Sequence, residues 1–520
     1  MSKLVSLLMA ASILCVGCSS SAQNSQSEEV SSLPSSTTEN SQKETSSQAE
    51  QEQEPVEISM LAPLFSDPPD MEGPFWTEWQ RLTNSKLDIE WVPSGDYDTK
   101  LNLKLASDGL PEVTIVNNLS EPVINAIQGG AFWGLSEFLG DMSAYPNLRD
   151  NLTPGAYKYT TYEGEIYGIP RSRPQRGCGL KIRKDWLDNL GLPVPTTLDE
   201  YTKALKAIVK SDPDGNGKDD TIGYICVGAP STWYDNLKNP FGYCIPTFND
   251  EGGFLPPYLT DNYFDFIEYA AMLYSEGLLP QEFVALKNQS GMDLFTTGQG
   301  ASYSRDMWWD YQWEQTLRQT QPEATIINLT LEGEKGNCIS IGTGVYCGMF
   351  VSSKVPNEKV TRMMDYFEAT ATQEVTDLGF YGIEGVHHEI VDGARKLNDF
   401  GVKEVNATTI VVGALDSRCD ALKYGKTDSA SAPLEYNLAK REESKDYEEI
   451  GNINIFDSLV SETWAAEWPK YVEDFRSMET QAVVGQITLE QFEEYVCDLR
   501  EKPEMKQAFL EFAKSYEAFK

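Results

Sequence analysis

Short apolar runs alternate with amphipathic stretches from residue 57 onward, and this alternation restricts the possible folds more than any other feature. The runs Glu57–Ala62, Lys86–Val92 and Glu112–Val116 have the length and residue types of β-strands. A helical stretch separates the first two runs, and Tyr97–Ala106 places its apolar residues on one helical face before the third. Strands that alternate with helices in this way predict an α/β fold with parallel sheets.

Helix boundaries are visible later in the chain. Residues Lys184–Leu190 stop at Gly191, a residue type that favours helix C-termini. Thr197, followed three residues later by Glu200, has the pattern of a capping box and predicts a helix start. The segment Leu489–Phe519 has helical periodicity throughout.

The N-terminus has the features of an export signal. A positive charge precedes the apolar run Leu4–Val16, which is too short to span a bilayer. Residues Leu14–Cys18 resemble a bacterial lipobox, so we predict a lipoprotein signal peptide over 1–17 and a lipid on Cys18. A plain secretory signal with an incidental Cys18 is the alternative. Residues 18–55 are rich in Ser, Gln, Glu and Thr, which predicts a disordered tether.

Charge and composition disfavour some classes of partner. The 520 residues include 42 basic and 80 acidic side chains, and the net charge of −38 disfavours nucleic acid and anionic lipid surfaces. No stretch after the tether has about 20 uninterrupted apolar residues. The length exceeds that of one simple domain, so two lobes are expected. The cysteines after Cys18 lack metal-binding spacing, and we expect them to be mostly buried and not disulfide-bonded.

Six short motifs follow one another along the chain. They are LASDGLPEV at 105–113, GEIYGIP at 164–170, IRKDWL at 182–187, PTTLDE at 195–200, DPDGNGKDD at 212–220 and YGIEGVH at 381–387. In order and spacing they resemble the extracellular solute-binding proteins, family 1, especially the long lipoprotein members from Gram-positive bacteria. The resemblance extends over residues 56–390 and is less distinct in the last part of the chain.

This resemblance implies a fold and a partner. The family has two α/β lobes joined by hinge crossovers, a type II periplasmic-binding-protein-like fold that closes on its ligand. By analogy, residues 56–165 and 335–380 form the first lobe, and residues 166–334 and 381–520 form the second. The resemblance also implies a monomer that delivers its solute to the permease subunits of an ABC importer, at the extracellular face of the cell membrane.

Oxygen-bearing residues alternate between positions 212 and 220, a pattern typical of calcium loops. Gly217 occupies the sixth position, where an EF-hand loop turns, but the twelfth position holds Gly223 where an EF-hand has Glu. We predict a structural calcium ion, and a polar turn after a helix is the alternative. The expected ligands are Asp212, Asp214, Asn216, Lys218 through its backbone carbonyl, and Asp220.

Aromatic and polar residues at several places are candidates for sugar binding, because aromatic faces stack on sugar rings. Asn118 follows a predicted buried strand, at the strand end where α/β proteins bind ligands. Arg171 follows the GEIYGIP motif, and acidic sugars are expected if it converges with Arg173 and Arg176. Core packing of the aromatics, a surface Arg171 and a structural loop at His387 are the alternatives. The candidate ligand-binding residues are Tyr303, Arg305, Trp308, Trp309, Trp233, Asn118, Arg171, Glu384 and His387.

These features together predict a lipid-anchored extracellular solute-binding protein that captures a small solute, an oligosaccharide, for an ABC importer. We expect no enzymatic activity. The rival interpretations are a surface glycan-acting enzyme and a peptide-binding or sensor lipoprotein. The chain has only His387 and His388, and it lacks both the HExxH zinc helix and the GxSxG nucleophile motif.

Overall fold

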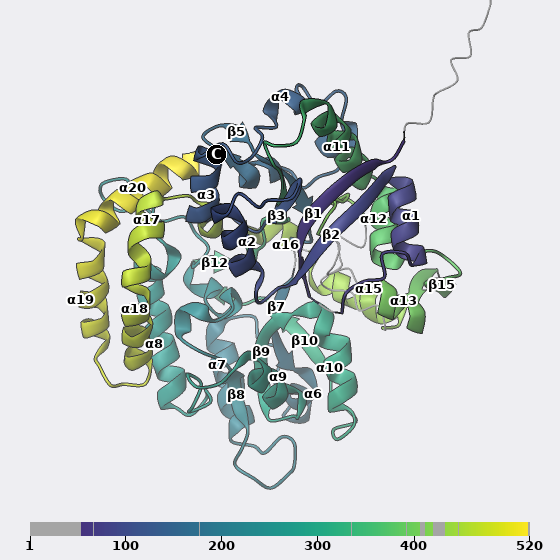
Figure 1. The fold of residues 1–520 in the computed structure, drawn as a ribbon. Coiled ribbons are helices and arrows are strands. Elements are labelled where there is room, and N and C mark those ends of the chain that lie inside the picture. Colours follow the sequence, from purple (N-terminus) through teal and green to yellow (C-terminus); the bar gives the residue numbers. More distant parts are fainter. Residues whose placement is uncertain are drawn as a thin grey trace, which may run out of the picture. The chain divides into compact units, whose positions relative to one another are not determined.

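The computed structural model describes residues 54–65, 67–175, 177–333, 335–337, 339–391, 393–405, 411–419, 432–445 and 447–517 (Figure 1). The predicted signal peptide at 1–17, the lipid site Cys18, the tether up to residue 53 and Arg176 lie outside these residues. Among the residues described, no helix is long and apolar enough to cross a membrane.

Five strands form the first sheet, in the order β2-β1-β3-β14-β6. Their bounds are β1 Val56–Leu64, β2 Ser85–Pro93, β3 Val113–Val116, β6 Gly168–Ser172 and β14 Val345–Val351. The first three strands are parallel, as the sequence predicts, but β14 is antiparallel to both β3 and β6. Because β6 leads toward the second sheet and β14 follows the return from it, the two strands run in opposite directions and the sheet is mixed.

In the part of the chain that the structure describes, eight helices pack around the first sheet, and all but the last of them bury apolar side chains. They are α1 Pro74–Leu82, α2 Tyr97–Ala106, α3 Glu121–Gln128, α4 Ser136–Leu139, α5 Pro146–Asp150, α11 Asn357–Thr370, α12 Gln373–Tyr381 and α13 Asp399–Glu404. The core of this sheet also contains Val405 and the segment Val411–Leu415, except Gly413. The hydroxyl of Tyr366 on α11 donates to the Val412 carbonyl (2.8 Å), which binds this segment to the first lobe. The sequence analysis placed residues 166–334 and 381–520 in the second lobe. The structure differs at both starts, because β6 belongs to the first sheet and the chain up to Leu415 contributes to its core.

Four strands form the second sheet, in the order β10-β7-β9-β8. Their bounds are β7 Cys178–Arg183, β8 Ile222–Ile225, β9 Gly300–Asp306 and β10 Ile326–Leu329. β7 is antiparallel to β9 and β10, whereas β8 is parallel to β9. This sheet is therefore mixed as well, with a core separate from that of the first sheet.

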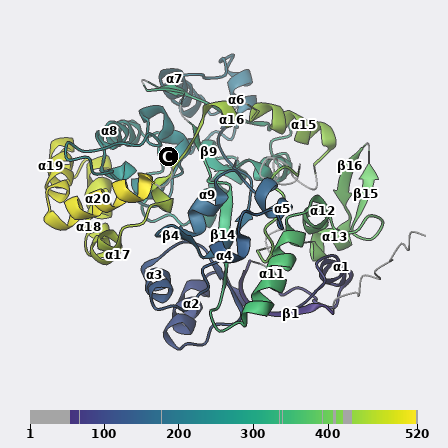
Figure 2. The ribbon, with the colours of Figure 1, turned by 90° about the horizontal axis from the view of Figure 1, so that it is seen from above.

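The remaining helices follow the second sheet in sequence or pack on its core. They are α6 Lys184–Asn189, α7 Leu198–Val209, α8 Asp261–Ser275, α9 Asn288–Thr296, α10 Asp310–Leu317, α15 Leu434–Glu443, α16 Tyr447–Ile450, α17 Glu462–Glu467, α18 Val472–Val483, α19 Leu489–Arg500 and α20 Pro503–Glu517. Thr197 caps α7 by accepting the Glu200 backbone N–H (3.2 Å), which confirms the predicted helix start. The Glu200 carboxylate accepts from Thr196 and not from the Thr197 N–H, so the predicted capping box forms only in part. The single helix expected over 489–519 is two helices, because Pro503 starts a new one at α20. Helices α17 to α20 and the β15–β16 hairpin (His388–Val391 and Ala394–Leu397) lie on opposite sides of the molecule in both views (Figure 2).

Residues 173–177 and 330–344 connect the two sheets. A parallel pair of short strands, β13 Ile339–Ile341 and β17 Gly451–Ile453, joins the second connection to the chain after α16. The other short elements are β4 Thr161–Tyr162, β5 Glu165–Ile166, β11 Glu332–Gly333, β12 Gly336–Asn337, η1 Ala156–Thr160, η2 Pro230–Thr232, η3 Asp235–Leu237, η4 Asn239–Phe241, η5 Pro257–Leu259, η6 Met307–Trp309, η8 Phe456–Ser458 and η9 Trp468–Lys470.

The cysteines agree only in part with the expectation from sequence. Cys226, Cys347 and Cys419 are buried free thiols, as predicted, but Cys497 is exposed. Cys244 is disulfide-bonded, contrary to the prediction. Exported proteins form and keep disulfides more readily than cytosolic ones, so a disulfide is compatible with the export signal.

Candidate ligand-binding cleft

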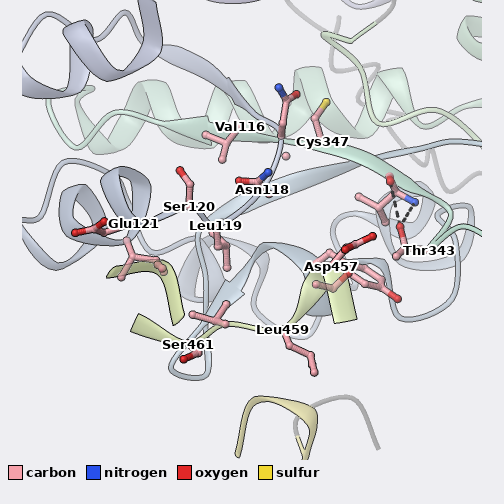
Figure 3. A pocket seen from close by; sticks show the side chains of 18 of the residues that line it. Val116, Asn118, Leu119, Ser120, Glu121, Thr343, Cys347, Asp457, Leu459 and Ser461 are labelled. Atoms are coloured by element: carbon pink, nitrogen blue, oxygen red, sulfur yellow. Dashed lines mark hydrogen bonds between the residues drawn. The ribbon is translucent and has the colours of Figure 1, made fainter. Parts of the chain in front are cut away.

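A cavity of about 250 Å³ lies between the first sheet and the segments near the C-terminus (Figure 3). Residues within 116–124 and 343–350 form one wall. Residues within 457–465, together with Phe512, form the other. The cavity is therefore built from chain segments more than three hundred residues apart, and we call it the cleft.

The first wall is made by the ends of two strands. β3 ends at Val116, and Asn117 and Asn118 continue from it along the cleft (Figure 3). The carboxyl ends of parallel strands are the usual ligand-binding edge of α/β sheets. Tyr346, near the start of β14, adds a half-buried aromatic ring to the same wall.

The second wall is the start of α17. The Ser461 hydroxyl accepts the Trp464 backbone N–H (3.0 Å) and donates to the Glu511 carboxylate (2.6 Å), which fixes the first turn of the helix. The Trp464 ring stacks on Trp468, with ring centroids 4.4 Å apart and planes at 13°. Trp464 is only partly buried, so the cleft contains an indole that is held in place and still accessible.

One carboxyl group of the second wall has an altered pKa. Asp457 projects from η8 into the cleft (Figure 3). The surrounding protein raises its pKa by desolvation, and the charge of Asp235 raises it further, while Lys238 acts in the opposite direction. Asp457 therefore takes up a proton at a higher pH than an ordinary surface carboxyl group does.

Two arginines flank the aromatic ring of the first wall. The guanidinium carbons of Arg171 and Arg173 each lie 5.6 Å from the centroid of the Tyr346 ring. Arg171 is 7% exposed, and burial lowers its pKa to about 10. Arg173 is half-buried, and its Nε has no hydrogen-bond partner. Two positive charges therefore lie close to the Tyr346 ring, next to the residues that line the cleft.

The two walls touch beside the cleft. The Glu462 carboxylate on α17 accepts hydrogen bonds from Gln128 Nε2 (3.0 Å) and from the Tyr162 hydroxyl (3.1 Å). Gln128 ends α3, and Tyr162 lies on β4, so both donors belong to the first lobe. These exposed hydrogen bonds connect α17 to the first lobe.

Comparison with known proteins identifies the family of this fold. The family described as bacterial extracellular solute-binding protein matches residues 62–374, which is more than half of the chain. The chain belongs to this family. The match includes β3, β14 and the two arginines beside Tyr346, whereas residues 457–465 lie beyond it.

Individual proteins resemble this solute-binding protein over most of its length. The polygalacturonan/rhamnogalacturonan-binding protein YtcQ of Bacillus subtilis is 29% identical over 85% of this chain and 87% of its own. Lipoprotein LipO of the same organism is 27% identical over 88% of this chain and 91% of its own. The alginate-binding protein AlgQ2, in a crystal structure without calcium ion, has a TM-score of 0.63 at 20% identity, covering 89% of this chain and 98% of that one. The last likeness shows the two-domain fold of periplasmic solute-binding proteins.

Two aromatic candidates from the sequence are packed inside the second lobe of this solute-binding protein. Tyr303 is 3% exposed and stacks on Trp313, with centroids 6.0 Å apart and planes at 8°. Trp233 is 4% exposed, and its indole N–H donates to the Gly228 carbonyl (2.8 Å). Both rings are held by apolar neighbours, so they match the alternative of core packing and do not line the cleft.

The other candidates occupy three different places. Asn118 lines the cleft, and the guanidinium carbon of Arg171 lies 5.6 Å from the centroid of the Tyr346 ring. Arg305 contacts the hydroxyl and ring of Tyr234, and Trp308 is 38% exposed beside the half-buried Trp309. None of Arg305, Trp308 and Trp309 belongs to the residues that line the cleft.

Glu384 and His387 lie on the first lobe away from the cleft lining. The His387 ring is fully buried, with Nε2 2.5 Å from Glu404 Oε2 and Nδ1 accepting the Ile383 backbone N–H (2.9 Å). Its ring also stacks on Phe400 at 5.3 Å. All of its polar atoms are therefore used inside the lobe, which matches the alternative of a structural loop.

The predicted calcium loop connects α7 to β8. The Asp212 carboxylate accepts the Gly217 backbone N–H (2.9 Å), and Asp214 accepts the backbone N–H (3.2 Å) and amide (2.7 Å) of Asn216. Asp212 Oδ1 is buried and has no hydrogen-bond partner. Among the residues described, no group of three or more His, Cys, Asp or Glu side chains is arranged to hold a metal ion. Hydrogen bonds within the loop therefore order it, and Oδ1 of Asp212 has no hydrogen-bond partner.

Sequence reasoning did not find Tyr346, Asp457 or Trp464. Tyr346 lies inside a strand, where an aromatic residue is ordinary. Trp464 follows Ser461 in the spacing of a helix cap, which marks a helix start but not a binding site. Only the fold brings these residues to Asn118, because they come from separate parts of the chain.

A buried carboxyl group of α18 gives this protein a pH-dependent contribution to stability. Glu479 accepts hydrogen bonds from Ser231 and from the Tyr263 hydroxyl (2.6 Å), and burial raises its pKa to about 7. The folded protein thus holds a proton that the unfolded chain releases near the ordinary pKa of 4.5. The resulting stabilisation is complete below that value and is lost as the pH rises through about 7.

We therefore expect Glu479→Gln to gain stability relative to wild type as the pH rises. Between about pH 5 and about pH 8 the difference should change by about 2 kcal/mol in favour of the variant. Thermal unfolding at both pH values measures it, with Glu473→Gln on the exposed side of the same helix as control. Parallel pH profiles of wild type and Glu479→Gln would contradict the assignment.

Proposed function

We propose that this solute-binding protein captures an oligosaccharide in the cleft between its two walls. The observation that carries the proposal is the pairing of accessible aromatic rings with directed polar groups. Tyr346 and Trp464 supply ring faces, and Asn118 on the first wall supplies an amide. Such rings stack on the apolar faces of sugars, while amides and carboxyls bind hydroxyl groups. The names of YtcQ and AlgQ2, both polysaccharide-binding, support the same class of solute.

We propose further that a lipid on Cys18 anchors the protein to the outer face of the cell membrane. The lipobox, the tether composition of residues 18–55 and the likeness to a lipoprotein support this. From there, as a monomer, the protein would deliver its solute to the permease subunits of an ABC importer. Nucleic acid is not proposed as a partner, because the net charge of −38 would repel it.

We propose that the solute is bound without turnover. His387 and His388 are both buried on the first lobe and do not line the cleft. Asp457 and Glu121 are the carboxylic acids that line it, and they come from opposite walls. The family and its compared members are binding proteins, which favours capture over catalysis. A glycan-acting enzyme and a peptide-binding sensor remain the alternatives that an experiment must separate.

Thermal unfolding in the presence of candidate solutes tests the proposed function. A ligand that binds only the folded state raises the free energy of unfolding by about 2.7 kcal/mol at a hundred times its Kd. We expect a raised unfolding midpoint with one class of oligosaccharide and none with peptides. A shift with peptides alone would overturn the saccharide proposal and favour the peptide-binding alternative.

We also propose that the loop of Asp212, Asp214, Asn216, Lys218 and Asp220 binds structural calcium. Two observations support this ligand set. Asp212 Oδ1 is buried without a partner, and desolvation together with the neighbouring Asp212 and Asp220 charges raises the pKa of Asp214. A cation would relieve both effects, and oxygen ligands of this kind are those that calcium prefers.

Calcium should therefore raise the unfolding midpoint, and a chelator should remove the increase. Asp212→Asn keeps an acceptor for Gly217 but loses the charge, so the calcium-dependent increase should be lost or strongly reduced. Asp219→Asn, which changes a neighbour outside the proposed ligand set, is the control. An unfolding midpoint of wild type that is the same with calcium and with chelator would favour the alternative of a polar turn.

A further inference from the structure

We infer that the solute carries a carboxylate and that Arg173, together with Arg171, binds it at one end of the cleft. The lining residues Thr343 and Tyr346 form this end, and Arg173 lies next to them. The inference rests on the proposed function and specifies the chemical class of the oligosaccharide as one that contains uronic acid.

The backbone places Arg173 next to the cleft lining. Its N–H donates to the Gly344 carbonyl (2.9 Å), between the two lining residues Thr343 and Tyr346. Its guanidinium lies against the Tyr346 ring and near Gly342, where a side-chain Cβ would be 3.8 Å from Nη2. Since residue 342 is a glycine, no side chain from that position covers the guanidinium.

The charge of Arg173 is not balanced within the part of the chain that the structure describes. No carboxylate there forms an ion pair with it, and its buried Nε has no hydrogen-bond partner. Two fully buried cations of the second lobe do have such partners: Arg183 is 2.5 Å from Asp185, and Lys238 is 3.1 Å from Asp235. Arg173 therefore keeps a half-buried positive charge without a carboxylate partner, in a chain that has 80 acidic side chains.

The positive charge of Arg171 also favours an anion at this position. It lies on the same Tyr346 ring, and the Arg173 charge contributes to the lowering of its pKa after desolvation. Two like charges beside one ring repel each other, and an anion bound at Arg173 would reduce this repulsion. The planar guanidinium fork matches a carboxylate with two parallel hydrogen bonds.

The rest of the cleft indicates how this anion is carried. Glu121 and Asp457 line other parts of it, so a solute with dense negative charge would be repelled there. An oligosaccharide that carries a single uronic acid among neutral rings presents a carboxylate to Arg173 and neutral hydroxyl groups elsewhere. This arrangement favours a uronic-acid oligosaccharide over a polyphosphate or a sulfated polymer.

Titration calorimetry with matched sugars tests the inference. The probes are a trisaccharide with one galacturonic acid ring among neutral rings and the same trisaccharide with this carboxylate methyl-esterified. Wild type should bind the acid at least about 10-fold more tightly than the ester, as expected for a charge-assisted pair. Arg173→Gln should lose this preference while it keeps the affinity for the ester. Arg149→Gln removes a surface charge paired with Asp150 and should keep the preference.

Each outcome separates the inference from the proposed function. Equal or tighter binding of the ester by wild type would overturn the carboxylate inference and leave saccharide capture intact. A preference for the acid that survives in Arg173→Gln would overturn the role of Arg173. Binding of neither probe, nor of any neutral oligosaccharide, would overturn the proposed function itself. Arg173→Lys keeps the charge but not the planar guanidinium fork, and it serves as a second test should Arg173→Gln fail to fold. A preference for the acid that is weaker than in wild type but not lost would support paired hydrogen bonding by Arg173.

Discussion

Replacing Asp310 with alanine is expected to lower the stability of the second lobe by about 3–5 kcal/mol, because the change leaves the buried Lys181 without its carboxylate partner. Asp310 is fully buried at the start of α10. Its carboxylate pairs with Lys181 of β7, lies 3.3 Å from Lys440 Nζ of α15, and accepts from Asn328 Nδ2 (2.6 Å). These contacts join α10, α15 and two strands of the second sheet through one side chain.

Urea unfolding of wild type and Asp310→Ala measures the effect as a shift in the midpoint. Asp199→Asn breaks an exposed helical pair with Lys203 and should change stability by no more than about 0.5 kcal/mol. Asp310→Asn retains a hydrogen-bond acceptor, so its loss of stability should lie between those of Asp310→Ala and Asp199→Asn. An Asp310→Ala variant as stable as Asp199→Asn would show that the buried charges find other partners or are hydrated.

Replacing Trp464 with alanine is expected to weaken solute binding by about 10- to 100-fold, as for a central aromatic contact. Its ring is fixed by Trp468 and by the capped first turn of α17, so it meets the solute without losing much side-chain freedom. Trp464→Phe retains a ring and should lose less. Calorimetry with the solute identified by the thermal screen measures the change.

Trp308→Ala is the matched control for this prediction. Trp308 is the more exposed of the two tryptophans and was a candidate from sequence, but it does not line the cleft. We expect its replacement to change the affinity by less than about 3-fold, or well under 1 kcal/mol. A larger loss in Trp308→Ala than in Trp464→Ala would place the solute at the end of β9 and contradict the cleft described here.

Individual strands and helices could be predicted from the sequence, because residues close together in the chain determine them. The runs at 57–62 and 86–92 became β1 and β2, and the predicted helix at 97–106 is α2. The Thr197 cap was correct for the same reason, since a hydroxyl three residues before a free N–H suffices to satisfy it. The family resemblance was confirmed by the match over 62–374.

The cleft could not be predicted, because it depends on contacts between distant segments. The antiparallel direction of β14 and the return of Val411–Leu415 to the first core follow from how the chain passes between the sheets. Tyr303 carried the expected aromatic signal, yet its place on β9 turns its ring toward Trp313. Periodicity and composition distinguish a buried face from an exposed one, but they do not say which ring borders a cavity.

The most direct test of the account is titration calorimetry of the purified protein with an oligosaccharide panel, followed by mass analysis of the recovered sugars. We predict saturable binding of one saccharide class, lost in Trp464→Ala, and recovery of that sugar with unchanged mass. Absence of binding by every saccharide, or recovery of shortened or otherwise altered sugars, would contradict capture without turnover in the cleft.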